Sequence, residues 1–483
     1  MKLSDLLLDI PVLESTVDPN TEITGVSYDS RRVEPGHLFA AITGYAADGH
    51  RFIPMAMEKG AACVICERKP ECDIPYIRVP DSRVALAVLG ANWYDHPAAK
   101  MTILGVTGTN GKTTVTYLLK SVLEQCCGAK VGLIGTIQNM IGDRCLPTER
   151  TTPESFDLQG LFAEMVEAGC THVVMEVSSH ALYLHRVDCI PFAVGAFTNL
   201  TEDHLDFHKT MEAYRKAKAL LFRRCGFSVF NIDDEMVAQT VNEAACWTLT
   251  VSANGAEADL TASDIVLGSD HVAFTATHKG ESWPVRVGIP GGFTVYNALT
   301  VLGMAIGLDI RPEAAIQALG RATGVKGRME VVPTPGKDYT VLIDYAHTPD
   351  ALENVLRSVR GFCKGRVIAV FGCGGDRDPI KRPIMGKIGV RLADLAIITS
   401  DNPRTEAPEK IIADIVKGTQ ELRKPFLVVE NRREAIARAM REAKAGDVIV
   451  LCGKGHETYQ IIGTEKTHLD EREEVAKQLT IDR

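Results

Sequence analysis

The stretch KMTILGVTGTNGKTTVTYLLKSVLE, residues 100–124, joins a short apolar run to a glycine-rich turn and then to an amphipathic segment. The run 101–106 has the length and composition of a buried strand. The apolar residues that follow recur with the spacing of one helix face: Val115, Leu118, Leu119, Val122 and Leu123. Together with the next apolar run, 130–136, the pattern predicts a strand–helix–strand unit, which forms a parallel sheet.

The glycine-rich turn of this unit has the composition of a phosphate-binding loop but not the usual spacing. In the pattern G-x-x-x-x-G-K-[ST] the first glycine would fall on Val106, whereas the nearest glycines are Gly105 and Gly108. Bound phosphates require freed backbone amides, a helix amino terminus, a lysine and a hydroxyl for Mg²⁺. All of these groups are present, so the loop is predicted to bind a nucleotide. The alternative, a glycine-rich turn that carries a lysine by chance, is disfavoured. The expected nucleotide-binding loop residues are Gly108, Thr109, Asn110, Gly111, Lys112, Thr113 and Thr114.

Composition and charge limit the class of protein. The chain of 483 residues is too long for one hydrophobic core, so about three domains are expected. A net charge of −9 disfavours nucleic acid as a partner. We expect a cytoplasmic protein without a membrane partner, because no apolar run reaches the roughly 18 residues of a membrane span. The acids within the apolar amino-terminal stretch also disfavour a secretory signal.

The thirteen cysteines are scattered in apolar, strand-like contexts, which is typical of reduced cysteines packed in a core. Cys63 and Cys66 have C-x-x-C spacing, but no second pair or histidine cluster follows at a zinc-like interval. A structural role is therefore expected for this pair.

The chain divides by its pattern into three parts, residues 1–97, 98–330 and 331–483. The first part mixes short strand candidates with turns, and the segment around Pro97 is predicted to be a linker. Further strands are predicted at 172–177, 192–200 and 227–233. Beyond residue 330, five strands alternate with helices, which indicates a second, doubly wound α/β sheet.

Polar stretches whose side chains could bind ligands or take part in catalysis follow the predicted parallel strands. They lie at the sheet edge where ligands bind in open α/β sheets. These stretches are TGTNGKTT, EVSSH, TNLTEDHLD, DYAHTP, GCGGDRD, SDNPR and GKGHE.

The loop GVTGTNGKTT resembles the ATP loop of the Mur ligases, which is also found in folylpolyglutamate synthetases. Further stretches resemble, in order, the branch of the family known as MurE: MEVSSHALYLHRV, FTNLTEDHLDFH, YRKAKALLF, GVKGRME, DYAHTPDALENVL, GCGGDRDPIKRP, DNPRTEAP and GKGHETYQ. The resemblance covers nearly the whole chain. It implies an α/β protein with an N-terminal mixed α/β UDP-binding domain, a central P-loop parallel-sheet ATPase domain and a C-terminal Rossmann-like domain that binds an amino acid.

The activity that this resemblance implies is ATP-dependent amide formation through an acyl phosphate. The implied substrates are ATP, UDP-MurNAc-L-Ala-D-Glu and meso-diaminopimelate, with Mg²⁺ as cofactor, and a monomer is expected. The resemblance assigns catalysis to Lys112, Glu176, His204 and Lys218. It places Mg²⁺ on Thr113, Glu176, His204 and Lys218, the last as a carbamylated lysine (N6-carboxylysine).

From the residues alone, simpler interpretations stay open for three of these positions. Glu176 also suits a turn or helix-capping carboxylate, and His204 a loop histidine with its own partners. The composition around Lys218 predicts only a solvated cation on a helix.

The resemblance also implies contacts with the two nucleotides. The positions for UDP and its sugar–peptide are Ser30, Tyr45, Ala46, Ala47, Thr151, Thr152, Ser178 and Arg186. Four further positions are expected near ATP: Asn297, Arg328, Asp344 and His347. The chain departs from the family at Leu184, where relatives carry glutamine, and at Thr294, which replaces an asparagine.

The motif DNPRTEAP points to the third substrate. The distal carboxylate of meso-diaminopimelate suits a bidentate guanidinium, and lysine as substrate lacks that carboxylate. Arg404 meets this requirement, although it also suits a cap on a strand-to-helix turn. The expected diaminopimelate-binding residues are Arg377, Asp401, Asn402, Pro403, Arg404, Gly453 and Glu457.

Several other functions compete with this hypothesis. Within the ligases, the added residue could be lysine, ornithine or amidated diaminopimelate. A folylpolyglutamate-type ligase would not need the first hundred residues, and a nucleotide-binding scaffold would not need Lys112, Glu176, His204 and Lys218 together. A P-loop kinase or GTPase is disfavoured, and no guanine-reading N-K-x-D is present.

Overall fold

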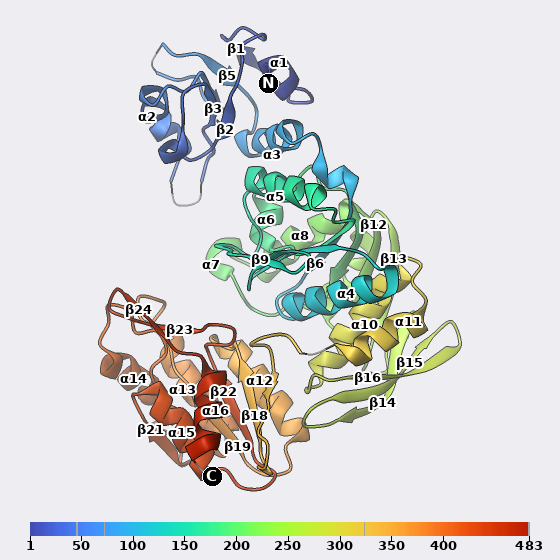
Figure 1. Ribbon diagram of the computed structural model, residues 1–483, viewed down its shortest axis with the longest axis vertical. Helices are drawn as coiled ribbons and strands as arrows, with labels where there is room; N and C mark the ends of the chain where they lie inside the picture. The colour runs from blue at the N-terminus through green and yellow to red at the C-terminus, as the bar shows by residue number, and fades with distance from the viewer. Residues whose placement is uncertain (45–46, 72, 323, 482–483) are drawn as a thin grey trace. The chain divides into compact units, whose positions relative to one another are not determined.

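The structure is a computed structural model that describes residues 1–44, 47–71, 73–322 and 324–481; Figure 1 labels its elements. The chain forms two compact units. The first contains Met1–Thr250 and Gly303–Ile310, and the second contains Val251–Leu302 and the chain from Arg311 onward. None of the helices in the described ranges is both long and apolar enough to cross a membrane.

The amino-terminal part of the first unit is a five-stranded sheet. Its order is β1 (Glu14–Ser15), β5 (Tyr76–Arg78), β4 (Cys63–Cys66), β3 (His37–Ala40) and β2 (Gly25–Ser27). The pairs from β5 to β2 are parallel. Its helices are α1 (Leu3–Leu6), η1 (Ser30–Arg32), η2 (Gly49–Phe52), α2 (Ile53–Glu58) and α3 (Ser82–Trp93). Cys63 and Cys66, at the two ends of β4, are free thiols buried in different apolar clusters, so they pack as small hydrophobes.

The centre of the first unit is a sheet with a parallel middle. Its strands run β12 (Cys225–Asn231), β11 (Phe192–Phe197), β6 (Thr102–Thr107), β10 (His172–Glu176), β7 (Val131–Ile134), β8 (Asn139–Ile141) and β9 (Arg144–Leu146). The pairs from β12 to β7 are parallel, and β8 and β9 add antiparallel pairs. The predicted strand–helix–strand unit is therefore confirmed as β6, α4 and β7.

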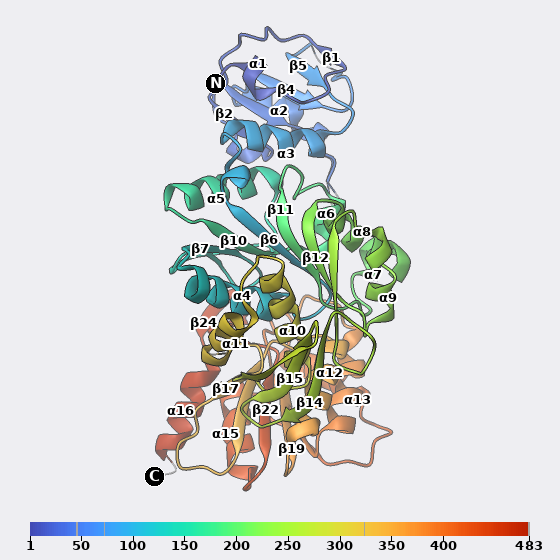
Figure 2. The same cartoon turned by 90° about the vertical axis from the view of Figure 1, so that its right-hand side faces the viewer.

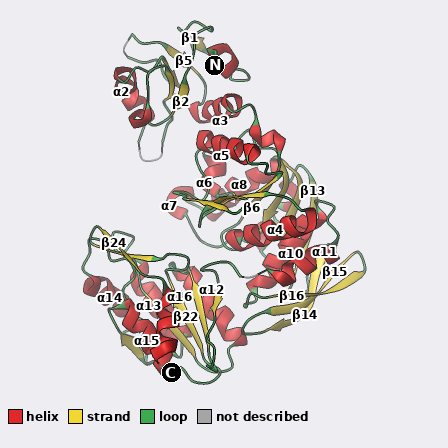
Figure 3. Cartoon of the chain, in the orientation of Figure 1, coloured by secondary structure: helices red, strands yellow, loops and turns green. Residues whose placement is uncertain are grey.

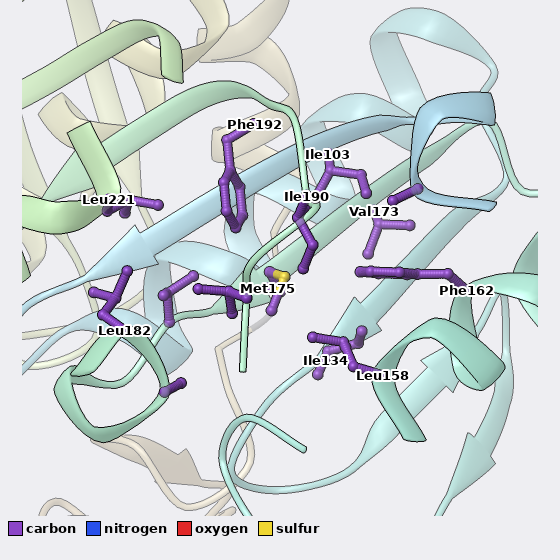
Figure 4. Close-up of a cluster of buried hydrophobic side chains, with 14 of the residues drawn as sticks. Ile103, Ile134, Leu158, Phe162, Val173, Met175, Leu182, Ile190, Phe192 and Leu221 are labelled. Carbon is purple, nitrogen blue, oxygen red and sulfur yellow. The ribbon is translucent and has the colours of Figure 1, made fainter. Parts of the chain in front are cut away.

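Helices cover both faces of this sheet. They are η3 (Pro97–Lys100), α4 (Lys112–Cys127), α5 (Ser155–Glu167), α6 (Ser179–Tyr183), α7 (Leu205–His208), α8 (Met211–Ala219), η4 (Leu220–Arg223), α9 (Glu235–Ala238) and η5 (Val241–Glu243). Figures 1 and 2 place α4 and α5 on opposite faces of the strands. Phe162 and Leu158 of α5 pack on Ile103, Val173 and Met175 of the sheet, as Figure 4 shows. The five predicted apolar positions of α4 are all buried, which confirms the helix face.

The predicted linker around Pro97 is a short helical turn that belongs to the core. Pro97 and Ala98 of η3 are buried, and Ala98 joins the same apolar cluster as Ile103. The predicted linker is thus packed at these two positions, whereas the residues on either side, 95–96 and 99–100, are exposed.

The region after residue 246 carries four strands that the sequence did not predict. They are β13 (Trp247–Ser252), β14 (Leu260–Leu267), β15 (Val272–His278) and β16 (Glu281–Val287), followed by α10 (Phe293–Ile306) and α11 (Pro312–Arg321). Strand β13 pairs with β14 in parallel. Strands β14, β15 and β16 form an antiparallel meander. Their polar and charged residues alternate with buried ones, a weak signal that typifies one-sided antiparallel strands.

The carboxy-terminal part of the second unit is a six-stranded sheet with helices on both faces. Its order is β17 (Glu330–Val332), β18 (Thr340–Asp344), β22 (Val448–Cys452), β19 (Val367–Phe371), β20 (Leu395–Ile398) and β21 (Phe426–Val428). All pairs from β18 to β21 are parallel. The five strands predicted after residue 330 are thus confirmed, and Figure 3 shows how they alternate with helices.

Two sets of helices enclose this sheet. On one face lie α15 (Arg432–Glu442) and α16 (Glu471–Ile481), whose Ile436 and Val475 join the strand cluster. The other face is covered by α12 (Pro349–Phe362), α13 (Lys381–Leu392) and α14 (Pro408–Lys417) (Figures 1 and 2). A hairpin of β23 (Tyr459–Ile462) and β24 (Glu465–His468) follows β22.

Candidate functional site

The loop between β6 and α4 is shaped to receive an anion. Gly111 precedes α4 in the left-handed region and gives the helix no side-chain cap. The first amides of α4 therefore keep their hydrogen-bonding capacity and the positive end of the helix dipole. Gly108 has φ +144°, and a Cβ there would lie 1.9 Å from Thr198 Oγ1, so only glycine lets the loop pass so close to β11.

The loop is held in place by the segment that follows β11. The backbone N–H of Thr109 donates to the Asn199 carbonyl at 2.9 Å, and the Asn110 N–H donates to Asn199 Oδ1 at 2.8 Å. Thr198 Oγ1 donates to the Asn110 carbonyl at 2.6 Å. These bonds join the loop to a neighbouring strand end, so its conformation does not depend on a bound nucleotide.

Two lysines meet at one carbonyl of the loop. Lys112 Nζ donates to the Gly108 and Thr109 carbonyls at 3.0 and 2.7 Å. Lys218 Nζ, from α8, donates to the same Gly108 carbonyl at 2.8 Å. Two cationic side chains thus lie beside the helix amino terminus of a chain with negative net charge.

Lys218 is buried, and the prediction of a solvated helix cation is wrong. Its side chain is 1% exposed and lies 4.6 Å from the centre of the Tyr214 ring. Burial, and then the charge of Lys112, hold the pKa of Lys218 well below its usual range. The composition of α8 could not reveal this, because the cover comes from the phosphate loop, more than a hundred residues away.

Glu176, at the end of β10, is the buried carboxylate of the site. Its Oε1 accepts from Thr113 Oγ1 at 2.9 Å and from the backbone N–H of Thr136 at 3.0 Å. Its Oε2 accepts from Thr136 Oγ1 at 3.0 Å. With 1% exposure, Glu176 is held in one orientation from both sides, so it also meets the simpler description of a turn carboxylate.

The oxygen atoms around Glu176 suit a hard cation. Mg²⁺ prefers carboxylate, hydroxyl and water oxygens, and Thr113 Oγ1 already lies next to Glu176. No group of three or more His, Cys, Asp or Glu side chains in the described ranges is arranged to hold a metal. The donors present therefore fit a cation that takes few protein ligands and completes its shell with water and phosphate.

His204 lies at the rim of this group. It starts α7 with φ +54°, its Nε2 is 3.5 Å from Asp203 Oδ2, and its ring packs edge-on against His180 at 4.8 Å. Burial, together with the charges of Lys218 and Lys112, lowers the pKa of His204. The imidazole is therefore neutral near pH 7 and can act as a ligand or acceptor beside the two lysines.

Hydroxyls and one guanidinium extend the site from Glu176 towards residue 150. Thr152 Oγ1 donates to the Glu176 carbonyl at 2.8 Å, and Thr151 Oγ1 lies 3.0 Å from Thr136 Oγ1. Ser178 caps α6 and lies 3.4 Å from Thr152. Arg186 donates to the Thr152 carbonyl at 3.4 Å. The four predicted positions for the sugar–peptide thus form one continuous group.

Glu154 orients the arginines of this group. It is 4% exposed, and its Oε2 lies 3.2 Å from Arg186 Nε, 3.4 Å from Arg83 Nη1 and 3.7 Å from Arg150 Nη1. One carboxylate among three guanidiniums leaves an excess of positive charge, which suits an anionic substrate. Of these four residues, Glu154 and Arg150 line part of a cavity of about 1040 Å³ within the first unit.

Of the residues predicted to contact uridine and pyrophosphate, two can be placed. Ser30 begins η1, is buried, and lies 3.4 Å from Met55 Sδ. Ala47 is exposed, and its carbonyl accepts from the Gly44 N–H at 3.0 Å. Tyr45 and Ala46 lie outside the described residues.

The predicted ATP contacts beyond the loop lie in the second unit. Asn297 of α10 is 4% exposed, and its Nδ2 has no hydrogen-bond partner among the described residues, so a buried donor is left for a ligand. Asp344 ends β18 and accepts from the N–H groups of Met329 and Ala346. Burial raises the pKa of Asp344, and Arg328 opposes that rise. His347 directly follows Ala346 and is exposed.

A second charged group lies at the carboxyl ends of β20 and β22. Asn402 Nδ2 donates to Glu457 Oε2 at 2.9 Å, and Lys454 Nζ donates to Asn402 Oδ1 and Glu457 Oε2 at 3.0 and 3.1 Å. Asp401 Oδ1 lies 3.6 Å from the same Nζ. A Cβ on Gly453, at φ +111°, would lie 2.5 Å from Asp401 Oδ2.

Arg404 lies next to this group with its backbone fixed. Its φ is +50°, its N–H donates to the Ile461 carbonyl at 3.1 Å, and its Nη1 donates to the Gly375 carbonyl at 2.8 Å. Pro403 before it is buried. Arg377 is exposed, and its Nη1 donates to the carbonyl of the neighbouring Asp376 at 3.2 Å. Arg404 does bond a turn, as the simpler interpretation proposed, while its second terminal nitrogen stays available for a carboxylate.

The sequence reasoning missed three residues that orient these sites: Thr136, Glu154 and Lys454. Thr136 follows β7, and Lys454 is part of GKGHE after β22, so the rule that ligands bind beyond strand ends could have found both. Glu154 follows no strand, and no signal in its neighbourhood separates it from a surface acid.

Three family models match successive parts of the chain. The model described as Mur ligase family, catalytic domain, matches residues 22–94. Mur ligase middle domain matches residues 106–305, and Mur ligase, glutamate ligase domain, matches residues 327–455. The chain thus has the three-domain α/β fold, while the boundaries after residues 97 and 330 stay a prediction.

Similar proteins match over the full length. The chain is 49% identical over 482 residues to UDP-N-acetylmuramoyl-L-alanyl-D-glutamate--2,6-diaminopimelate ligase 1 of Clostridium acetobutylicum, with 99% of each chain covered. The ligase so named from Clostridium tetani is 48% identical over 482 residues, with 98% of each covered. A solved structure of a 2,6-diaminopimelate ligase of this name has a TM-score of 0.74 at 31% identity, covering 100% of this chain and 99% of that one.

Replacement of Gly108 by alanine tests the geometry of the loop. The added Cβ would collide with Thr198 Oγ1, so we expect ATP affinity to fall at least about 100-fold, equivalent to ~3 kcal/mol. Titration with a fluorescent ATP analogue measures this. Gly128→Ala is the control, because Gly128 also has positive φ but nothing lies within 4 Å. Equal affinity of the two variants would contradict the role of Gly108.

Proposed function

Since the chain belongs to the Mur ligase family, we propose that it adds meso-2,6-diaminopimelate to the D-glutamate γ-carboxylate of UDP-MurNAc-L-Ala-D-Glu, with conversion of ATP to ADP and phosphate. The product is a precursor of peptidoglycan. The observation that carries the proposal is the meeting of Lys112 and Lys218 at the Gly108 carbonyl, beside the buried Thr113–Glu176 pair.

The first half of the proposed reaction is phosphoryl transfer. A γ-carboxylate oxygen of the D-glutamate attacks the γ-phosphorus of ATP, the bond to the β–γ bridging oxygen breaks, and ADP leaves. Both reactants are anions, so the protein must supply positive charge between them. Lys112 and the open amides of α4 supply that charge on the phosphate side.

Glu176, Thr113, His204 and carbamylated Lys218 are the residues proposed to hold Mg²⁺. When bound, Mg²⁺ neutralises phosphate charge and fixes the phosphate oxygens. Thr136 keeps the carboxylate of Glu176 in a fixed orientation. This lowers the free-energy cost of orienting Glu176 to bind Mg²⁺. Arg186 and the hydroxyls of Thr151, Thr152 and Ser178 are proposed to hold the peptide end of the UDP substrate.

The second half is amide formation. The amine of diaminopimelate adds to the acyl carbon, phosphate leaves with its bonding electron pair, and the nitrogen loses its proton. We assign the distal amino-acid head of diaminopimelate to the group in the second unit: Arg404 for the carboxylate, and Asp401, Asn402 and Glu457 for the ammonium. Arg377 is proposed to hold a carboxylate, and Asn297, Arg328, Asp344 and His347 to contact ATP.

The function is tested by ADP release in the presence of UDP-MurNAc-L-Ala-D-Glu and a panel of amino acids. We expect release with meso-diaminopimelate, and little with lysine or ornithine, because neither offers a distal carboxylate to Arg404. ADP release with amidated diaminopimelate, compared with release with the free form, shows which of the two is the substrate. Release with lysine alone would contradict the proposed specificity, and release with a folate and glutamate would contradict the proposed function.

Arg404→Ala should raise the KM for diaminopimelate roughly 10- to 100-fold, the usual effect of losing a hydrogen-bonded charged pair. The KM values for ATP and the UDP substrate should stay within about twofold, because Arg404 bonds only groups of the second charged site. Steady-state kinetics measure all three. Arg423→Ala, at an exposed position of the same unit, is the matched control, and an unchanged diaminopimelate KM in Arg404→Ala would refute the assignment.

Carbamylation of Lys218 is tested with ¹³C-labelled bicarbonate. The buried amine, with its lowered pKa, offers a neutral nucleophile that adds to CO₂ and releases one proton. We expect one carbamate carbon signal by ¹³C NMR that is lost in Lys218→Met. It should persist in Lys216→Met, which alters an exposed lysine of the same helix. A wild-type spectrum without that signal would overturn the modification.

A further inference from the structure

Lys454 is completely buried within the second charged group. It follows β22, its side chain is 0% exposed, and its Nζ lies 3.0 Å from Asn402 Oδ1, 3.1 Å from Glu457 Oε2 and 3.6 Å from Asp401 Oδ1. A buried ammonium is costly unless it is paired and hydrogen-bonded. Nζ donates two hydrogen bonds, to Asn402 and Glu457, and lies within ion-pair distance of Asp401, so the lysine is engaged by this group and closed off from solvent.

The charges of the group do not cancel. Lys454 faces two carboxylates, Asp401 and Glu457, whose side chains are 9% and 12% exposed. The next buried cation, Arg432, is already paired with Glu471 at 2.8 Å, with both side chains fully buried. One negative charge is therefore left over, which suits one ammonium of an incoming amino acid.

Lys454 also determines how Asn402 is oriented. Asn402 Oδ1 accepts from Lys454 Nζ and from the Ile461 N–H at 3.0 Å, so its Nδ2 must point to Glu457 Oε2, at 2.9 Å. Burial raises the pKa of Asp401. The charges of Lys454, and then of Arg432 and His347, outweigh this effect and hold the pKa below its usual value. Lys454 thus favours the ionised form of Asp401, and its hydrogen bond holds Glu457 in place.

We propose that Lys454 is a positioning residue for the amino-acid substrate: it cancels one of the two carboxylate charges and leaves a pocket that binds a single ammonium. This inference rests on the proposed function. It adds a residue that acts through Asp401, Asn402 and Glu457 and does not itself contact the substrate.

Lys454→Met tests the proposal. Without the lysine, two buried carboxylates face each other and one takes up a proton, so the Asn402 amide loses its fixed orientation. We expect the KM for meso-diaminopimelate to rise at least about 10-fold, with KM for ATP and for the UDP substrate within about twofold. Lys466→Met is the control, because Lys466 lies 3.6 Å over the same Tyr459 ring that Lys454 faces at 5.8 Å, but on the surface.

A second variant separates charge from packing. Lys454→Met/Glu457→Gln removes one positive and one negative charge, so the group keeps the net charge that it has in the wild type. Its diaminopimelate KM and Tm should therefore be no worse than those of Glu457→Gln alone. If Lys454→Met does not fold but the double variant does, that result would also support the proposal.

Three results would overturn it: an unchanged diaminopimelate KM in Lys454→Met, single effects that multiply in the double variant, or failure of both variants to fold. A wild-type enzyme without diaminopimelate-dependent ADP release would instead contradict the proposed function, and that assay precedes the variants.

Discussion

The carbonyl of Gly108 is the point on which the first charged site depends. It accepts hydrogen bonds from Lys112 and Lys218, which the chain carries 106 residues apart, so two amino groups share one acceptor. Burial and the charge of Lys112 together lower the pKa of Lys218, so the two lysines are not equivalent. The loop can offer this carbonyl because Gly108 adopts φ +144° beside Thr198, and the helix behind it begins without a side-chain cap. The site is therefore ready for a polyphosphate in a chain whose net charge is negative.

The same physical arrangement recurs at the second site with the opposite sign. At the first, Lys112 and the open amides of α4 offer positive charge to a phosphate; around Lys454, acids exceed the cation by one. Both groups lie beyond the carboxyl ends of parallel strands, where side chains from separate crossovers meet without backbone competition. In each case a residue that was not among the predicted site residues, Thr136 or Lys454, fixes a carboxylate by a hydrogen bond. A buried excess charge of one sign is a specific receptor for a ligand of the other.

Much of this arrangement could be predicted from local patterns. The strand–helix–strand unit around the loop follows from periodicity, and the five strands after residue 330 follow from their alternation with helices. The strands β14 to β16 were missed, since half of their side chains are solvated and break the apolar runs. The burial of Pro97 and Ala98 was not predicted, because small apolar residues look alike in cores and in loops.

The sequence by itself determined the order of strands and helices, the phosphate loop and the set of residue types available for chemistry, because these depend on neighbours along the chain. Only the tertiary structure decided which side chains are buried and which charges are left unbalanced. Lys218 and Lys454 both look like ordinary solvated lysines in the sequence, and each is covered by segments distant along the chain. Burial and charge balance are sums over neighbours in space, and no local pattern carries them.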